Sequence, residues 1–214
     1  MPSASGHVVP RLVSDMAPSQ LDALREVGNI GAGHAATALS EMTGRRVAIG
    51  VPTVSVAALG TIGEILGRSD VPLILARVRA TGSFTGGLVI AFTEDAAGDL
   101  TDLLLGRKSR GTSWFDELGS SAIKEVGNVL GAAYVNALAT MTGWSIPIST
   151  PDLVYARADW AVSLLSLESQ SDCGICFETS FRVEGTDAEV RGHVVLFPQL
   201  DVLESLLEAI GAEA

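Results

Sequence analysis

Hydrophobic and polar positions follow two periods along the chain, and both periods occur twice. In residues 19–43 and 113–142, hydrophobic side chains recur three and four positions apart, which is the spacing of one face of an α-helix. Each segment starts at a serine followed three residues later by an aspartate, and each ends at Thr-Gly, which are typical helix boundaries. The pattern therefore predicts two long helices, the first about 36 Å in length.

The segments that follow each long helix have the composition of β-strands. They are rich in Val, Ile and Thr, and turn residues such as Gly82 separate neighbouring runs, which predicts hairpins. The runs are 47–57, 71–81 and 83–92 in the first half and 146–155, 175–183 and 188–197 in the second. A shorter helix is predicted at the end of each half, at 94–105 and 200–210.

The two halves are related in sequence. Shifting the chain by 99 residues against itself gives 12 identities in the 34 positions of residues 21–54, where composition alone gives roughly two. We therefore expect a duplication. The predicted domain is a single α+β unit over residues 16–214, with repeats at about 16–106 and 112–214, a short basic connector between them and a loose tail at 1–15. Two pseudo-symmetric halves are expected to form one shared sheet, with both long helices on its surface.

Composition narrows the class of protein. The chain has 214 residues, 14 Lys+Arg against 25 Asp+Glu and a net charge of -11, which argues against a nucleic-acid partner because such binding depends on clustered cations. Neither a signal peptide nor a membrane-spanning segment is predicted, so we expect a cytoplasmic protein without a membrane partner. Lys108 and Lys124 are the only lysines. This fits either a salt-rich cytoplasm or an ordinary acidic protein.

Polar residues that recur in both halves are the candidate functional residues. Positions three and four apart share a helix face, and the resulting stripe contains Asp22, Glu26, Asn29 and Gly33 in the first helix and Ser121, Glu125, Asn128 and Ala132 in the second. A single Glu-x-x-Asn is most simply a solvated helix face. Its occurrence in both halves favours a site, although Gly28 and Gly127 could serve helix packing, and Pro52 and Pro151 could fix a strand start.

The spacing of these residues resembles a known family. Asp22-x3-Glu26-x2-Asn29-x22-Pro52 and its copy Ser121-x3-Glu125-x2-Asn128-x22-Pro151 are similar to the paired signature of the CheC phosphatases of bacterial and archaeal chemotaxis. The resemblance covers nearly the whole chain and implies two related halves of helix and sheet. The related CheX proteins carry one such motif and FliY adds a flagellar-switch domain, so CheC is expected to be the closer match.

The resemblance implies an activity, the hydrolysis of the aspartyl phosphate of a CheY-like response regulator. By this resemblance Asn29 and Asn128 would hold the attacking water, while Glu26 and Glu125 would pair with a lysine of the regulator. The chain would need no cofactor of its own, because the Mg2+ belongs to the phosphorylated regulator. An amide orients water without adding negative charge to an anionic site.

The remaining motif positions are given lesser roles by the same resemblance. Asp22 and Ser121 would contact the regulator at the margin of each site, and Pro52 and Pro151 would support the geometry without touching substrate. Two other functions remain open at this stage. One is an adaptor that binds and regulates the receptor deamidase CheD, and the other is a flagellar-switch component.

Three further patterns are given structural interpretations. The glycines of residues 28–33 have the wrong spacing for a dinucleotide-binding loop and follow no predicted strand. Cys173 and Cys176 have the spacing of half a zinc site, but no second ligand pair accompanies them, which favours partly buried free thiols in or beside a strand. His34 falls on Ala133 in the other half, so a surface histidine is expected.

Overall fold

The computed structural model describes residues 16–66, 71–106, 116–169, 173–184 and 189–211. The predicted tail at 1–15 and the connector after residue 106 lie outside the described residues. The first half contributes four strands to the sheet, followed by a short helix: β1 (Val47–Ile49), β2 (Thr53–Ala58), β3 (Pro72–Ala80) and β4 (Gly86–Thr93), then α4 (Glu94–Leu105). The second half has β5 (Asp152–Arg157), β6 (Cys173–Val183), β7 (Glu189–Pro198) and α7 (Leu200–Gly211).

The long helices are α2 (Pro18–Thr43) and α5 (Glu117–Thr142), and their predicted C-terminal ends are confirmed. Both end at a glycine in the left-handed conformation, Gly44 and Gly143. The predicted starts were less accurate. The first helix begins one residue before Ser19, and the second begins after Asp116, whose carboxylate accepts a hydrogen bond from the Gly119 N–H at 2.6 Å.

All seven strands belong to one antiparallel sheet in the order β1-β6-β7-β4-β3-β5, with β2 also paired to β6. The predicted hairpins are present as β3–β4 and β6–β7, and β4 pairs with β7 at the centre. Each half gives its first long strand to the other half. β2 pairs with β6, and β5 pairs with β3. The shared sheet is therefore confirmed, and the strands that complete it are exchanged between the halves.

Two predicted strands are shorter than expected. Residues 47–57 form two strands rather than one, because the chain leaves the ladder between Ile49 and Thr53. Residues 146–155 contribute a single bridge at Ile148 before β5 begins at Asp152. Both interruptions contain a motif proline, which has no N–H to donate to a ladder.

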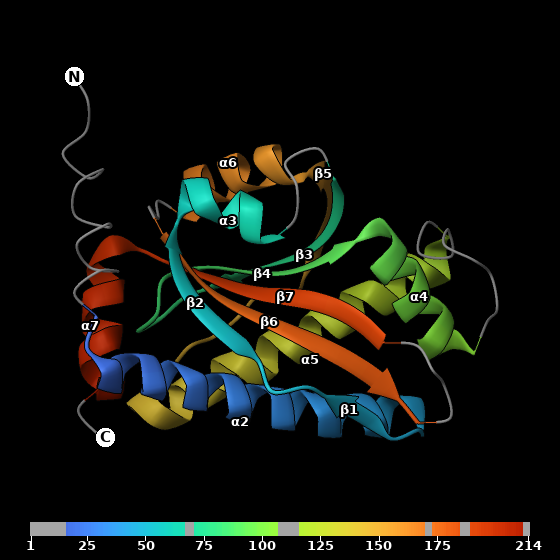
Figure 1. The fold of residues 1–214 in the computed structure, drawn as a ribbon, viewed down its shortest axis with the longest axis horizontal. Helices are drawn as coiled ribbons and strands as arrows, with labels where there is room; N and C mark the ends of the chain where they lie inside the picture. Colours follow the sequence, from blue (N-terminus) through green and yellow to red (C-terminus); the bar gives the residue numbers. More distant parts are fainter. Residues whose placement is uncertain (1–15, 67–70, 107–115, 170–172, 185–188, 212–214) are drawn as a thin grey trace.

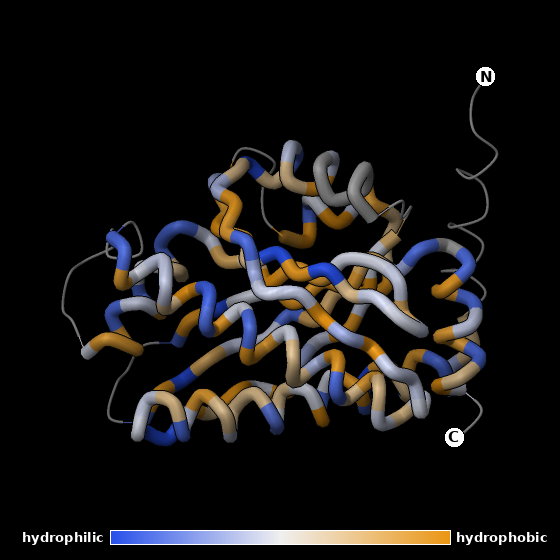
Figure 2. Tube along the Cα trace, turned by 180° about the vertical axis from the view of Figure 1, so that it is seen from behind, coloured by the Kyte–Doolittle hydropathy of each residue, from blue (hydrophilic) through white to orange (hydrophobic). Residues whose placement is uncertain are grey.

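Helices cover both faces of the sheet (Figure 1). α2 and α5 lie together on one face, where a large hydrophobic core forms between them and the strands. Hydrophobic and hydrophilic positions alternate along both helices, as in amphipathic helices (Figure 2). A smaller core on the opposite face is covered by α3 (Leu59–Leu66) and α6 (Ala158–Ser169), which contact each other.

The sequence pattern did not predict α3 or α6. α3 has only eight residues and follows β2 without a break, so its short apolar run cannot be distinguished from a strand by periodicity. α6 likewise continues directly from β5. Residue Trp160, which was assigned to no regular element, lies in α6 and is 54% exposed.

Candidate functional site

The first motif lies on the solvent-facing side of α2. Asp22, Glu26 and Asn29 are all exposed, whereas Leu24 and Val27, which lie between them along the chain, are completely buried. This difference follows from helical geometry, because residues that share the polar face point away from the core. The three polar side chains are therefore open to another molecule.

The second motif has the same placement on α5. Ser121, Glu125 and Asn128 are exposed, and Ile123 and Val126 are completely buried. All six motif residues on the helices thus keep their polar groups at the surface. This is the arrangement that a site acting on another protein requires.

A glycine next to each asparagine holds the helix close to the sheet. A Cβ built on Gly28 would lie 3.0 Å from the Phe177 ring, and one built on Gly127 would lie 2.4 Å from the Ala76 Cβ. No larger side chain fits at position 127 without a shift of backbone. The structural interpretation of these glycines is therefore correct, and the close approach fixes the depth of the helix turn that presents each asparagine.

Of the two motif prolines, Pro151 lies against the helix turn that carries Asn128. Pro52 is buried and Pro151 is half-buried, and each precedes the first residue of a strand. The Pro151 ring lies 3.7 Å from the Cβ position of Gly127. Proline fixes its own backbone angle, so the loop against the helix is stiff at this contact.

The two motifs differ in local charge. Arg25 donates a hydrogen bond to the Asp22 carboxylate at 2.6 Å, and both side chains are more than half exposed, at 56% and 68%. In the second motif Ser121 replaces the aspartate, and exposed Lys124 takes the place of Arg25. An exposed pair contributes little stability. It does, however, neutralise Arg25, whereas Ser121 offers Lys124 no opposite charge.

The surface beyond the first asparagine is open at Gly33. Gly33 lies one turn after Asn29, and a Cβ built on it would have no neighbour within 4 Å. His34 is exposed, as predicted for a surface histidine. Another protein can therefore approach the helix backbone closely on this side.

Comparison with known proteins identifies the family. The sequence model of the CheC-like family matches residues 20–56 and 118–155, the segments that hold the two motifs. The CheY-P phosphatase CheC of Bacillus subtilis is 30% identical over 197 residues, which cover 90% of this chain and 94% of that protein. The chain belongs to the CheC-like family.

One further relative of this CheC-like protein is named for the flagellar motor switch, and two solved structures share its fold. The flagellar motor switch phosphatase FliY of Bacillus subtilis is 29% identical over 140 residues, covering 65% of this chain and 36% of that protein. The structure of Thermotoga maritima FliY matches with a TM-score of 0.75 and 23% identity, covering 92% of this chain and 98% of that chain. The FliM middle domain from H. pylori matches at 0.60 with 14% identity, covering 90% and 99%. These structural matches show that the CheC-like chain shares its α+β fold with them.

The other sequence patterns of the CheC-like chain have structural explanations. Residues 28–33 lie inside α2 and follow no strand, unlike a dinucleotide-binding loop. Cys173 and Cys176 lie in β6 as fully buried thiols that form no disulfide, and burial raises the pKa of the Cys176 thiol to about 12. Within the described ranges no three His, Cys, Asp or Glu residues gather as metal ligands. Among the same residues, no helix is both long and apolar enough to span a bilayer.

The sequence did not point to one feature, a cavity on the sheet face opposite the motif helices. Its polar lining comes from Arg77, Arg79, Ser149 and Asp152, which belong to different halves of the chain. The alternation of arginines in β3 is visible in the sequence. Their proximity to residues 149–152 depends on the exchange of β5, which no local pattern predicts.

Proposed function

We propose that this CheC-like protein hydrolyses the aspartyl phosphate of a CheY-like response regulator at two sites, one on each long helix. The observation that carries the proposal is the presentation of an exposed Glu and Asn, one turn apart, on both α2 and α5. It is supported by the 30% identity to a protein named as a CheY-P phosphatase over nearly the full length of both chains.

The chemistry requires positioning rather than a nucleophile from this chain. A water oxygen attacks the phosphorus in line, the bond from phosphorus to the aspartyl oxygen breaks, and its electron pair remains on the regulator's carboxylate. Both hydrogens of the water leave with the inorganic phosphate. Asn29 and Asn128 would each accept a hydrogen bond from the attacking water through the side-chain carbonyl, and so hold it in line. Their exposure allows them to enter the regulator's site.

The glutamates serve docking in this mechanism. Glu26 and Glu125 are exposed and lie one turn before the asparagines, where a carboxylate would pair with a cationic side chain of the regulator. A carboxylate facing the phosphoryl oxygens without a cation between them would be repelled, so we assign these residues to orientation of the complex. We place Asp22 and Ser121 at the margin of each site. The two prolines would support the geometry from behind.

The test is the release of phosphate from a phosphorylated CheY-like regulator in the presence of Mg2+. Wild type is compared with Asn29→Ala, Asn128→Ala and the double variant, and the double variant is expected to lose the acceleration by about 10²-fold. Each single variant should retain the activity of the other site. Because both asparagines are exposed, their truncation should leave the thermal unfolding temperature unchanged.

His34→Ala is the matched control, since His34 is exposed on the same helix and has no counterpart in α5. A double variant that hydrolyses as fast as wild type would refute the proposed role of the asparagines. A wild type that binds the regulator but leaves its dephosphorylation unchanged would instead identify an adaptor. Pull-down of CheD by such a protein would then give the adaptor its partner.

A further inference from the structure

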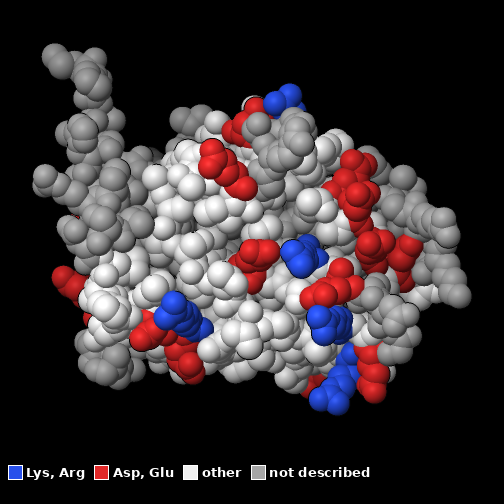
Figure 3. All heavy atoms as spheres, in the orientation of Figure 1, with Lys and Arg blue, Asp and Glu red and all other residues white. Residues whose placement is uncertain are grey.

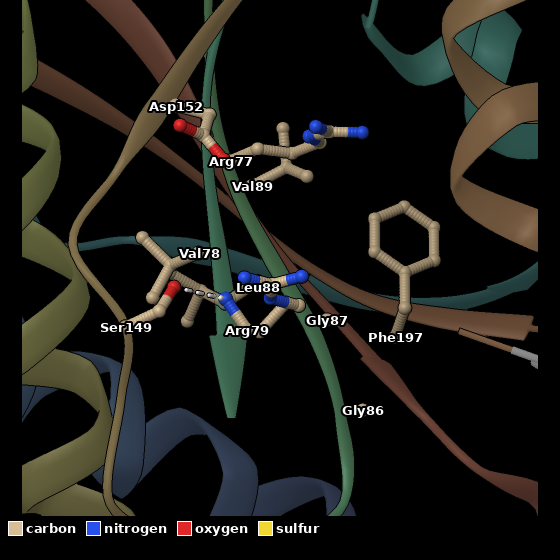
Figure 4. Close-up of a pocket in the computed structure, with 10 residues that line it drawn as sticks. All are labelled: Arg77, Val78, Arg79, Gly86, Gly87, Leu88, Val89, Ser149, Asp152 and Phe197. Carbon is tan, nitrogen blue, oxygen red and sulfur yellow. Dashed lines mark hydrogen bonds between the residues drawn. The ribbon is translucent and has the colours of Figure 1, made fainter. Parts of the chain in front are cut away.

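A cavity of about 240 Å³ lies on the sheet face that carries α3 and α6, away from the motif helices. Figure 4 shows its wall, to which β3, β4, β7 and the segment before β5 contribute. Arg77 and Arg79 are two positions apart on β3 and therefore point to the same face, with the Phe197 ring of β7. Two guanidinium groups thus border the same space, whereas the Phe197 ring is fully buried.

The cavity is more positive than the rest of the molecule. Its lining contains two arginines against one aspartate, whereas the whole chain has 25 acidic residues and 14 basic ones. In Figure 3 acidic side chains gather over α4 at one end of the molecule. Asp152 stands opposite Arg77 in the β3–β5 ladder and offsets one of the two positive charges.

Arg79 is the stronger candidate to bind a ligand. Its backbone is fixed by two hydrogen bonds with Ser149, one in each direction. Its side chain is exposed, and the guanidinium makes no hydrogen bond or ion pair within the part of the chain that the structure describes. Gly87 stands opposite Arg79 in the β3–β4 ladder, so no side chain fills the space beside it.

We propose that this cavity binds a small oxyanion, a phosphate or carboxylate group. The planar guanidinium forks of its two arginines match the oxygens of such a group. The volume lies just below the range of about 300–1,000 Å³ that is typical for drug-sized ligands, which favours a smaller molecule.

The cavity lies next to the residues that support the second motif. Ser149 and Asp152, which line it, flank Pro151, and the Pro151 ring contacts the Gly127 position that precedes Asn128. Ala76, the neighbour of Arg77, packs against the same glycine from the sheet. A bound oxyanion would therefore brace the strand and the loop that hold the turn of Asn128. Any effect of this bracing on hydrolysis rests on the proposed function, but binding itself does not.

The first motif has no equivalent site. Phe177 of β6 packs on Gly28 in the same way as Ala76 of β3 packs on Gly127. The residues that follow Phe177 therefore correspond to those that follow Ala76. In this alignment Glu178 takes the place of Arg77, and Ser180 takes the place of Arg79. A carboxylate in place of a guanidinium repels an oxyanion. The proposed ligand is therefore specific for one half of the chain.

Titration of the full chain with phenylphosphonate, followed by two-dimensional 1H-15N NMR, tests the proposal. Saturable shifts are expected at the amides of residues 77–79, 127–128, 149, 150 and 152, with the amides of residues 28, 29, 50, 51 and 53 unchanged. Arg79→Gln should weaken binding by at least about tenfold. Arg182→Gln, which removes an exposed arginine of β6 paired with Glu189, is the matched control and should bind as wild type. Inorganic phosphate as a second probe should shift the same amides, because the arginines recognise the oxyanion and the buried Phe197 offers the phenyl ring no surface.

Several results would overturn the inference. These are the absence of saturable shifts, equal affinity of wild type and Arg79→Gln, shifts with phenylphosphonate that inorganic phosphate does not reproduce, or shifts centred on residues 28–29. The effect on catalysis is measured separately, with phosphate release by Asn29→Ala, which keeps the second motif, compared with Asn128→Ala. The ligand should change the activity of Asn29→Ala and leave the activity of Asn128→Ala unchanged. If neither variant nor wild type hydrolyses the regulator's phosphate, the proposed function fails while the binding result stands.

Discussion

Replacing Gly127 by alanine tests whether close contact between α5 and β3 holds the second motif. The new Cβ would lie 2.4 Å from the Ala76 Cβ. Carbon atoms in ordinary contact are about 3.5 Å apart or more, so the helix and the strand would have to separate by about 1 Å. The neighbouring atom is the β-carbon of an alanine, which cannot move without the backbone of a central strand.

The expected magnitude combines two opposite effects. Overpacking a dense core costs about 1–3 kcal/mol, and this contact belongs at the upper end because neither atom has rotational freedom. Alanine is favoured over glycine in a helix interior by about 1 kcal/mol. Gly127→Ala is therefore expected to lower the free energy of unfolding by about 2 kcal/mol. Gly33→Ala, where the new Cβ has no neighbour within 4 Å, should raise it by about 1 kcal/mol.

Urea unfolding followed by far-ultraviolet circular dichroism measures the difference between these variants. A gap of about 3 kcal/mol corresponds to roughly 6–12 °C in Tm for a chain of this length. The free energy of unfolding of Gly28→Ala should lie between those of Gly127→Ala and Gly33→Ala, because its Cβ would lie 3.0 Å from the Phe177 ring. Equal stability of Gly127→Ala and Gly33→Ala would refute the assignment of the helix depth to this contact.

Tyr134→Phe is expected to raise the free energy of unfolding by about 1 kcal/mol, since the buried hydroxyl has no hydrogen-bond partner among the described residues; an unchanged or lower urea midpoint would contradict this. Asp116→Ala should lower the free energy of unfolding by about 1 kcal/mol, because α5 loses its N-cap. The control Asp116→Asn can still cap the helix and should keep most of this stability. Burial raises the pKa of the Cys176 thiol to about 12, so iodoacetamide should modify it only after unfolding; rapid labelling of the native chain would show that β6 opens. Burial lowers the pKa of His193, against a smaller opposing effect of Glu178, so the folded state resists protonation and stability should fall as the pH drops below about 6.5. His193→Gln should remove part of that slope in urea titrations at several pH values.

The parts of the fold that were predictable depend on local patterns. The long helices, the two hairpins and the exposure of the motif residues all follow from periodicity within one segment, and the left-handed Gly44 and Gly143 mark the helix ends. The α+β class and the shared sheet followed from finding the same elements twice. The start of α5 was misplaced because both Ser113 and Asp116 are good N-cap residues, and the sequence alone does not rank them.

Features that depend on distant partners were not predictable in the same way. The pairing of β2 with β6 and of β5 with β3 is decided by the whole sheet, because each strand would fit several neighbours by its own pattern. The cavity at Arg79 follows from that pairing. The close contact of Gly127 with Ala76 likewise joins residues that are 51 positions apart in the chain.

The exchange of strands also determines the order in which the molecule can be completed during synthesis. β2 ends at Ala58 and its partner β6 begins at Cys173, so 114 residues must be translated between them. At about 5–20 residues per second, this delay is roughly 6–23 s. Throughout it the nascent first half would display unpaired strand edges on β2 and β4, whose partners β6 and β7 have not yet been made, and such edges invite pairing with other chains. The ribosome-bound intermediate, more than the finished protein, is therefore the state in which this architecture needs protection from aggregation.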